Sequence, residues 1–183
     1  MLVSMIRHVL LIAGMWLATV LQAQADQRRA FRVGLDVAWF PQPELAGIGS
    51  YAEFSWHFTD RLAVVPRIMG ASGIERSGTY FSHVAALGAS VCFRFSPFPE
   101  GPLRPTLDVG PVYSRFTYND RFARPVPVEV REHVPGFFIS AALKIMDLRR
   151  MGLGVRVSSA SGVRDGIIQQ DILQGGVFME VAF

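Results

Sequence analysis

The sequence ends in Gly175-Gly176-Val177-Phe178-Met179-Glu180-Val181-Ala182-Phe183, and this stretch decides the fold. Its residues alternate in character with a period of two, which is the side-chain period of a β-strand. The stretch therefore predicts a strand whose apolar face runs to the final aromatic residue. That face carries Val177, Met179, Val181 and Phe183, and the other carries Gly176, Phe178, Glu180 and Ala182.

The same alternation recurs upstream, and no segment shows a sustained helical period. The clearest case is residues 31–39, where Phe31, Leu35 and Trp39 share one face while Arg32 and Asp36 share the other. We therefore expect an all-β chain. The predicted strands cover about residues 31–39, 48–58, 62–70, 86–95, 106–118, 137–145, 152–158 and 175–183.

The N-terminus carries the features of a signal peptide. A short apolar run over residues 9–20 follows Arg7, and Ala23-Gln24-Ala25 has the small-x-small pattern of a cleavage site. The run is too short to span a bilayer, which takes about 20 helical residues. We predict a signal peptide over residues 1–25 and a single domain over 26–183.

Composition excludes several classes of protein. The formal net charge is +3 and falls to +2 without Arg7, which gives no basis for nucleic-acid binding. Cys92 is the only cysteine, so an intrachain disulfide is excluded. No later segment approaches the ~18 apolar residues of a transmembrane helix.

Alternation alone does not say which face lies inside the sheet. A soluble lipocalin-like barrel has its apolar face inward, whereas a membrane barrel has it outward. Here the polar face is rich in Gly, Ala and Ser, which suits a crowded barrel interior. Aromatic residues also gather at the predicted strand ends, as in the interfacial belts of membrane proteins. They are Phe31, Trp39, Phe58, Phe81, Phe95, Tyr113, Phe137 and Phe183.

The terminal strand resembles the closing strand of bacterial outer-membrane β-barrels. Over residues 26–183 the chain is similar to the small eight-stranded group, which includes the OmpA transmembrane domain and the OmpX-like and opacity-type surface proteins. The resemblance implies an eight-stranded antiparallel up-and-down barrel, integral to the outer membrane, with both termini periplasmic. It also implies that the barrel-assembly machinery reads Val177, Met179, Val181 and Phe183. No segment follows Phe183 in this sequence, so peptidoglycan anchoring is not expected.

An up-and-down barrel with periplasmic termini has three periplasmic turns and four extracellular loops. The predicted turns are 59–61, 96–105 and 147–151, and the predicted loops are 41–46, 71–79, 119–135 and 159–170. Gly, Pro, Ser and Asp in these segments are typical of turns.

The interior of an eight-stranded barrel is just filled by side chains, so an open channel is not expected. Charges walled off from water need partners. We expect a neutralising lumen network that closes the barrel, with a gated pore as the alternative. Its predicted members are Asp36, Glu53, Asp108 and Glu180 with Arg67, Arg94, Lys144 and Arg156.

No catalytic, cofactor or metal site is predicted. Glu53, Ser55 and His57 share a strand face, but residues two apart lie ~6.6 Å apart along a strand, too far for a triad. Outer-membrane lipid A deacylases use a His-x-Ser motif, and the late segment 156–162 contains no His. His133 beside two acids is weak evidence for a metal.

Functional residues are expected in the longest loop, 119–135, because binding concentrates in loops. Arg121, Arg124 and Arg131, with Arg115 just before them, suit contacts with lipopolysaccharide phosphates, and the equal alternative is an ordinary solvated loop. Alternation over 126–131 favours an extension of the sixth strand above the membrane as a raised edge, which can recruit an extracellular protein by strand addition. Pro125, Pro127 and Pro135 limit that pairing, because each removes a donor. The leading hypothesis is a non-enzymatic structural or adhesive surface barrel. The alternatives are a lipid-modifying enzyme and a narrow solute pore.

Overall fold

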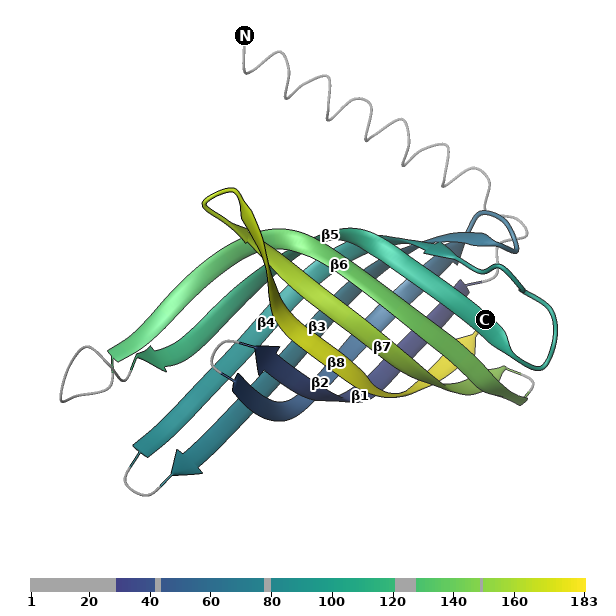
Figure 1. The fold of residues 1–183 in the computed structure, drawn as a ribbon. Helices are drawn as coiled ribbons and strands as arrows, with labels where there is room; N and C mark the ends of the chain where they lie inside the picture. Colours follow the sequence, from purple (N-terminus) through teal and green to yellow (C-terminus); the bar gives the residue numbers. More distant parts are fainter. Residues whose placement is uncertain (1–28, 42–43, 78–79, 121–127, 149) are drawn as a thin grey trace, which may run out of the picture.

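The computed structural model describes residues 29–41, 44–77, 80–120, 128–148 and 150–183. These residues form eight antiparallel strands that close into a barrel, as the sequence predicted (Figure 1). No helix within the described ranges is long and apolar enough to cross a membrane. The predicted signal peptide lies outside the described residues. The strands are β1 (Arg29–Pro41), β2 (Glu44–His57), β3 (Leu62–Ser77), β4 (Tyr80–Phe95), β5 (Arg104–Asp120), β6 (Val128–Leu148), β7 (Met151–Arg164) and β8 (Ile167–Ala182).

The first and last strands close the barrel. The β1–β8 ladder runs from Ala30↔Ala182 to Trp39↔Leu173. It ends with a pair of backbone hydrogen bonds between Arg29 and Phe183, 3.1 and 2.8 Å long. Every strand therefore has a neighbour on both sides within the barrel wall, and the wall has no open edge.

The outer face of the wall is apolar. Leu35 is 69% exposed, Ile48 76% and Leu87 65%, whereas their neighbours along each strand are turned inward. A water-soluble barrel would bury such residues. Exposed aromatic side chains mark both ends of this apolar band, among them Phe31 and Phe95 at one end and Trp39 and Tyr113 at the other. The apolar face is therefore outside and meets lipid.

The strands extend well beyond their predicted ends, and the four long extracellular loops of the sequence prediction are wrong in extent. Only short connections remain, because β3 continues to Ser77 and β6 begins at Val128. Glycine in and beside these segments allows neighbouring strands to approach closely, and does not mark turns there. A Cβ on Gly47 would collide with the carbonyl oxygen of Ser72 on the neighbouring strand. The predicted periplasmic turns do separate strands, at 58–61, 96–103 and 149–150.

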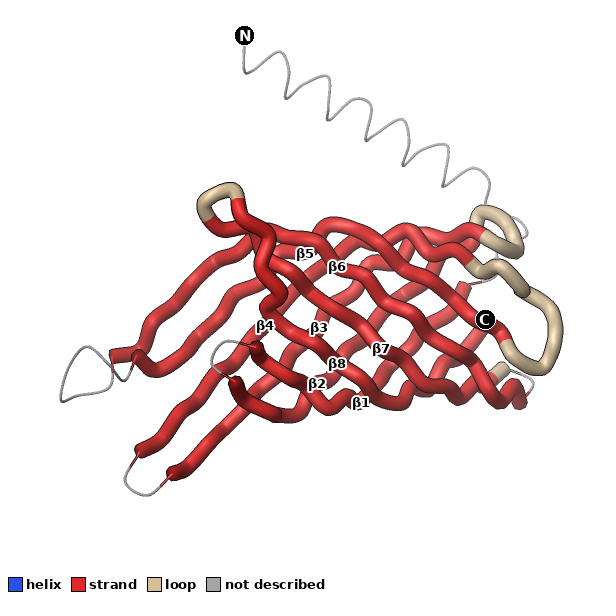
Figure 2. Tube along the Cα trace, in the orientation of Figure 1, coloured by secondary structure: helices blue, strands red, loops and turns tan. Residues whose placement is uncertain are grey.

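Long hairpins rise from one end of the barrel. Figure 1 shows the β3–β4 and β5–β6 hairpins extending well past the ends of β1 and β2, and the β7–β8 hairpin bending aside, at the end opposite the C-terminus. Figure 2 shows the longer described loops at the other end, beside the C-terminus. We call the three hairpins the arms. β6 is the longest strand, with 21 residues.

Two prolines interrupt the ladders of the wall. The β2–β3 ladder has a gap between Glu53↔Arg67 and Trp56↔Val64, opposite Pro66. The β4–β5 ladder has a gap between Ser90↔Val112 and Phe93↔Val109, opposite Pro111. Proline has no N–H, so each gap marks one missing ladder hydrogen bond.

The outward position of Leu35 can be tested by charge. Leu35→Arg places a cation near the middle of the lipid-facing wall and should destabilise the barrel by about 2–4 kcal/mol. The measurement is urea unfolding in lipid vesicles, with Leu35→Met as the matched control. Equal stability of Leu35→Arg and the parent protein would mean that this face meets water.

Candidate functional site

An ionic network fills the half of the lumen nearest the termini. Arg67 Nε donates to Glu53 Oε2 at 2.7 Å, and Arg94 Nε donates to Asp108 Oδ1 at 2.7 Å. Each arginine also reaches the other carboxylate through Nη2, at 2.5 Å. The four side chains come from β2, β3, β4 and β5, and all are at most 2% exposed. Two arginines and two acids therefore alternate around one buried ring.

A second group continues the network across β1, β6 and β8. Arg32 Nη2 donates to Glu180 Oε2 at 2.6 Å, and Lys144 Nζ donates to Glu180 Oε1 at 3.0 Å. Arg32 also lies 3.2 Å from Glu53, which joins the two groups. The sequence analysis placed Arg32 on the same face as Asp36 but did not assign it to the network.

Arg156 and Asp36 form a separate buried pair. Arg156 Nη2 donates to Asp36 Oδ2, and its guanidinium lies 3.4 Å over the Tyr51 ring. The structure thus turns all eight predicted lumen residues inward and places each in at least one ion pair.

The extracellular half of the lumen is apolar. Bulky apolar side chains that are at most 5% exposed point inward there, with small residues such as Ala86 and Ser114 between them. Leu45 and Val134 belong to segments predicted to be loops that continue as strands, whereas Val112 and Phe116 lie in the predicted strand 106–118. This apolar layer consists of Phe40, Leu45, Val84, Val112, Phe116, Val134 and Ile172.

A smaller ion cluster lies on the outer side of the apolar layer. Arg164 of β7 donates to Glu132 of β6 at 2.6 Å and to Asp171 of β8 at 2.5 Å. Its guanidinium lies 5.7 Å from the Phe116 ring centroid. The sequence analysis did not expect this cluster, because it read the segments around Glu132 and Arg164 as loops.

Two of the predicted lipopolysaccharide contacts, Arg115 and Arg131, lie on β5 and β6. Arg115 and His133 are directly opposite each other in the ladder, and Arg131 is opposite Thr117. The Tyr113 hydroxyl lies 3.0 Å from His133 Nδ1. Arg115 is exposed and has no hydrogen bond or ion pair with another described side chain. Arg121 and Arg124 lie outside the described residues.

Glu132 points into the lumen and His133 points outward, so the two do not form a joint metal site. Across the described part of the chain, no three His, Cys, Asp or Glu side chains are grouped to hold a metal ion. Ser55 donates to the Ala30 carbonyl at 3.3 Å rather than to His57. The structure brings His83 to within 3.3 Å of Ser72 on β3, a pair that the sequence analysis missed.

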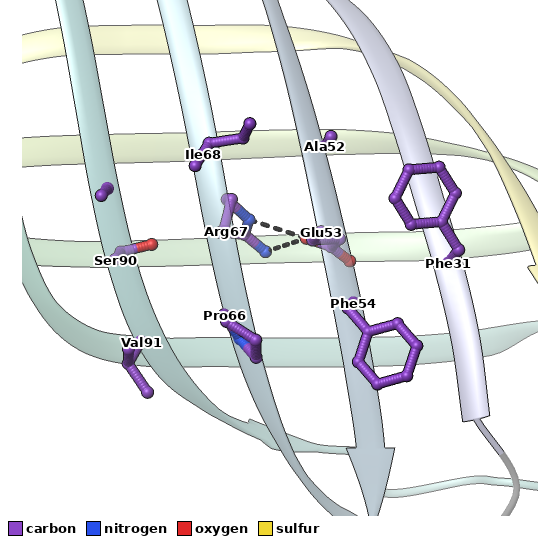
Figure 3. A pocket seen from close by; sticks show the side chains of 10 residues that line it. Phe31, Ala52, Glu53, Phe54, Pro66, Arg67, Ile68, Ser90 and Val91 are labelled. Atoms are coloured by element: carbon purple, nitrogen blue, oxygen red, sulfur yellow. Dashed lines mark hydrogen bonds and ion pairs between the residues drawn. The ribbon is translucent and has the colours of Figure 1, made fainter.

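The outer wall is hollowed where the β2–β3 ladder is interrupted. Figure 3 shows Pro66 between Val91 and Phe54, with Phe31 on the next strand beyond Phe54. The hollow has a volume of about 380 Å³ and an apolar lining. The Glu53–Arg67 pair lies directly behind it. The hollow opens on the outer, apolar side of the wall.

The ionic network can be tested by removing one cation. Arg94→Met leaves Glu53 and Asp108 buried with one arginine between them, and should cost about 3–5 kcal/mol of unfolding free energy. The matched control is Arg61→Met in an exposed turn, which should change stability by less than about 0.5 kcal/mol. A loss below about 1 kcal/mol for Arg94→Met would show that the network contributes little.

Comparison with known proteins identifies the fold. No protein-family model matches the chain, and no curated sequence matches it. Among solved structures, Neisserial surface protein A aligns with a TM-score of 0.59 at 10% identity, covering 86% of this chain and 96% of that one. Ail of Yersinia pestis, solved with the heparin analogue sucrose octasulfate, gives 0.59 at 7% identity and covers 86% and 99%.

A major outer membrane protein from Thermus thermophilus aligns with a TM-score of 0.50 at 9% identity, covering 85% of this chain and 99% of that one. At such identities the likeness concerns the fold. The closed eight-stranded topology and the apolar outer wall agree with it. The chain thus has the fold of the small eight-stranded outer-membrane β-barrels.

Proposed function

We propose that this protein is a non-enzymatic surface barrel that binds an extracellular protein through its arms. The observation that carries the proposal is the edge of β6 that faces away from β5. The β6–β7 ladder has its last pair at Gly136↔Gly162, whereas β6 continues outward to Val128. Residues 132–135 therefore have β5 on one side and no ladder partner on the other among the described residues. Such a strand edge is a template for strand addition.

The direction of the backbone groups on this edge follows from Pro135. Proline has no N–H, yet the β5–β6 ladder runs past Tyr113↔Pro135 without a break. Because N–H groups alternate in direction along a strand, the odd-numbered residues of β6 direct their N–H groups away from β5. His133 thus offers a backbone donor to an added strand.

Two similar structures support a surface role. One is by name a Neisserial surface protein, and the other is by name an attachment invasion locus protein. At identities of 10% and 7%, these structures offer an analogy for a surface role but do not indicate which molecule this chain binds. Fold likeness alone does not define function, so the β6 edge is the stronger support.

The filled lumen argues against transport of solutes through the barrel. The ionic network and the apolar layer are stacked in the barrel, and both are almost fully buried. A solute would have to separate the ion pairs and then cross a stretch without polar partners. We therefore propose that the barrel is closed to solutes.

The outer wall supports a second contact, with lipopolysaccharide. Arg115 lies beyond the exposed Tyr113 ring, at the level where lipid headgroups begin, and it has no described protein partner. His133 is opposite it and Arg131 is two residues farther along β6. Arginine binds phosphate through paired charge-assisted hydrogen bonds. We propose that lipopolysaccharide phosphates occupy this position.

Two substitutions of His133 distinguish strand addition from a contact of the His133 side chain. His133→Pro removes the edge N–H and should abolish adhesion, because β5 does not use that donor. His133→Ala keeps the N–H and should retain adhesion. The measurement is adhesion of bacteria producing each variant to a panel of immobilised host-surface proteins.

Equal loss in both variants would indicate a contact of the imidazole ring instead of strand addition. Failure of the parent protein to bind any member of the panel would contradict the adhesive role. A changed lipid A mass spectrum on expression would contradict the non-enzymatic proposal, and would direct attention to the Ser72–His83 pair.

The lipid contact has its own test. Arg115→Ala should weaken lipopolysaccharide binding about tenfold, because one charge-assisted hydrogen bond contributes about 1.5–3 kcal/mol. Binding is measured with the purified barrel and vesicles containing lipopolysaccharide. Arg61→Ala, at the other end of the barrel, is the control. Unchanged binding of Arg115→Ala would contradict the assignment.

A further inference from the structure

The hollow in the outer wall is framed by two neighbouring rows of outward side chains. In one row Ala52 and Ala89 stand on either side of Ile68, so this row is low on both flanks. In the other row the ladder between Phe54 and Pro66 is interrupted. The result is an open depression with a volume of about 380 Å³ and apolar walls (Figure 3). It suits a slender apolar chain, because such a chain leaves no polar group without a partner.

The outward residue pair next to the hollow, on the side of the chain termini, is polar. In the β1–β2 ladder Phe31 is opposite Phe54 at the edge of the hollow, and Arg29 is opposite Trp56 two residues farther along. Residues two apart in a strand lie about 6.6 Å apart. The Trp56 ring also packs edge-on against the Phe54 ring, with 5.2 Å between the centroids. A cation and an indole group therefore stand at the rim of the wall, directly beside the hollow.

The polar groups of this rim pair have no partner within the described part of the chain. The guanidinium of Arg29 forms no ion pair or hydrogen bond with another described residue. The indole N–H of Trp56 has no acceptor there either, although both side chains are only partly exposed. Indole N–H groups usually find an acceptor, and tryptophan is enriched at membrane interfaces. A guanidinium is well matched to a phosphate, which it binds through paired charge-assisted hydrogen bonds.

A glycerophospholipid carries its groups in the order in which the wall presents their partners. Its phosphate lies at the membrane surface, its ester carbonyls lie just below, and its acyl chains extend into the hydrocarbon. The wall has Arg29 and Trp56 at the rim, and the apolar hollow begins at the next outward pair. The charge of Arg29 complements the phosphate, and the N–H of Trp56 complements an ester carbonyl, which is a pure acceptor. One lipid molecule therefore satisfies the rim pair and fills the hollow.

We propose that the hollow binds one acyl chain of a glycerophospholipid, with the lipid phosphate on Arg29 and an ester carbonyl on the Trp56 N–H. The bound chain covers the interruption of the β2–β3 ladder and keeps water from the Glu53–Arg67 pair directly behind it. The site lies at the opposite end of the barrel from Arg115 and on other strands. It is independent of the proposed adhesive role, since it makes no contact with the outward edge of β6.

The experiment is native mass spectrometry of the complete barrel in detergent, titrated with palmitoyl-oleoyl phosphatidylglycerol. The parent protein should retain one phospholipid per barrel. Ala52→Phe places a ring in the hollow and should weaken this binding about tenfold, because the ring excludes about two methylene groups of the acyl chain. The matched control is Ala141→Phe, at an exposed position of β6 outside the hollow, which should bind the lipid as the parent does.

A second pair of variants tests the phosphate contact, and it carries the test if Ala52→Phe fails to fold. Arg29→Gln should weaken phosphatidylglycerol binding about tenfold, whereas Arg150→Gln, in the exposed turn between β6 and β7, should leave it unchanged. Palmitoyl-oleoyl glycerol has the same chains without the phosphate, so the parent and Arg29→Gln should bind it equally.

Two results would overturn the proposal. Equal retention of phosphatidylglycerol by the parent, Ala52→Phe and Arg29→Gln would mean that the retained lipids have no fixed position on the wall. A dimer of barrels that dissociates in Ala52→Phe would mean that a second copy of the chain, and not a lipid, covers the hollow.

Discussion

The pairing of β1 with β8 is the constraint on which the rest of the structure depends. In hydrocarbon, a backbone N–H or C=O without a partner costs several kcal/mol, so a sheet in the membrane must close. Once it closes, each strand has one face toward lipid and one toward the lumen. The apolar faces of all eight strands then point outward. The apolar exterior and the charged interior are therefore two results of one closure.

Closure also explains why the interior charges are so fully paired. Eight strands leave too little space for bulk water, so every inward charge must find a partner among the side chains across the lumen. Arg67 and Arg94 meet this requirement by each binding both Glu53 and Asp108. Beyond this network the lumen holds apolar side chains, and charge returns at the mouth, where Arg164 binds Glu132 and Asp171. The inward residues along each strand thus differ with their position along the barrel axis.

The period-two alternation predicted the strands. The small residues on the polar face, the aromatic residues at the strand ends and the resemblance of the terminal strand to outer-membrane barrels predicted the closed barrel and the inward direction of residues such as Glu53 and Arg94. The strand ends were beyond these signals, because glycine and serine occur both in turns and where backbones approach closely, as at Gly47 and Ser72. The partners within the network depend on register, which single strands do not contain. The Ser72–His83 pair and the Arg164 cluster join residues of different strands or of predicted loops, so only the assembled sheet reveals them.

Pro66 and Pro111 divide the wall into parts of unequal strength. Their ladder gaps lie on either side of the β3–β4 hairpin, whose own ladder is unbroken from Leu62↔Phe95 to Ser77↔Tyr80. The hairpin is thus a cooperative unit bounded by two seams. Each seam is bridged from inside by an ion pair, Glu53–Arg67 across one and Arg94–Asp108 across the other. The lumen charges therefore join neighbouring strands on the inner surface at the two places where proline removes a backbone hydrogen bond from the sheet.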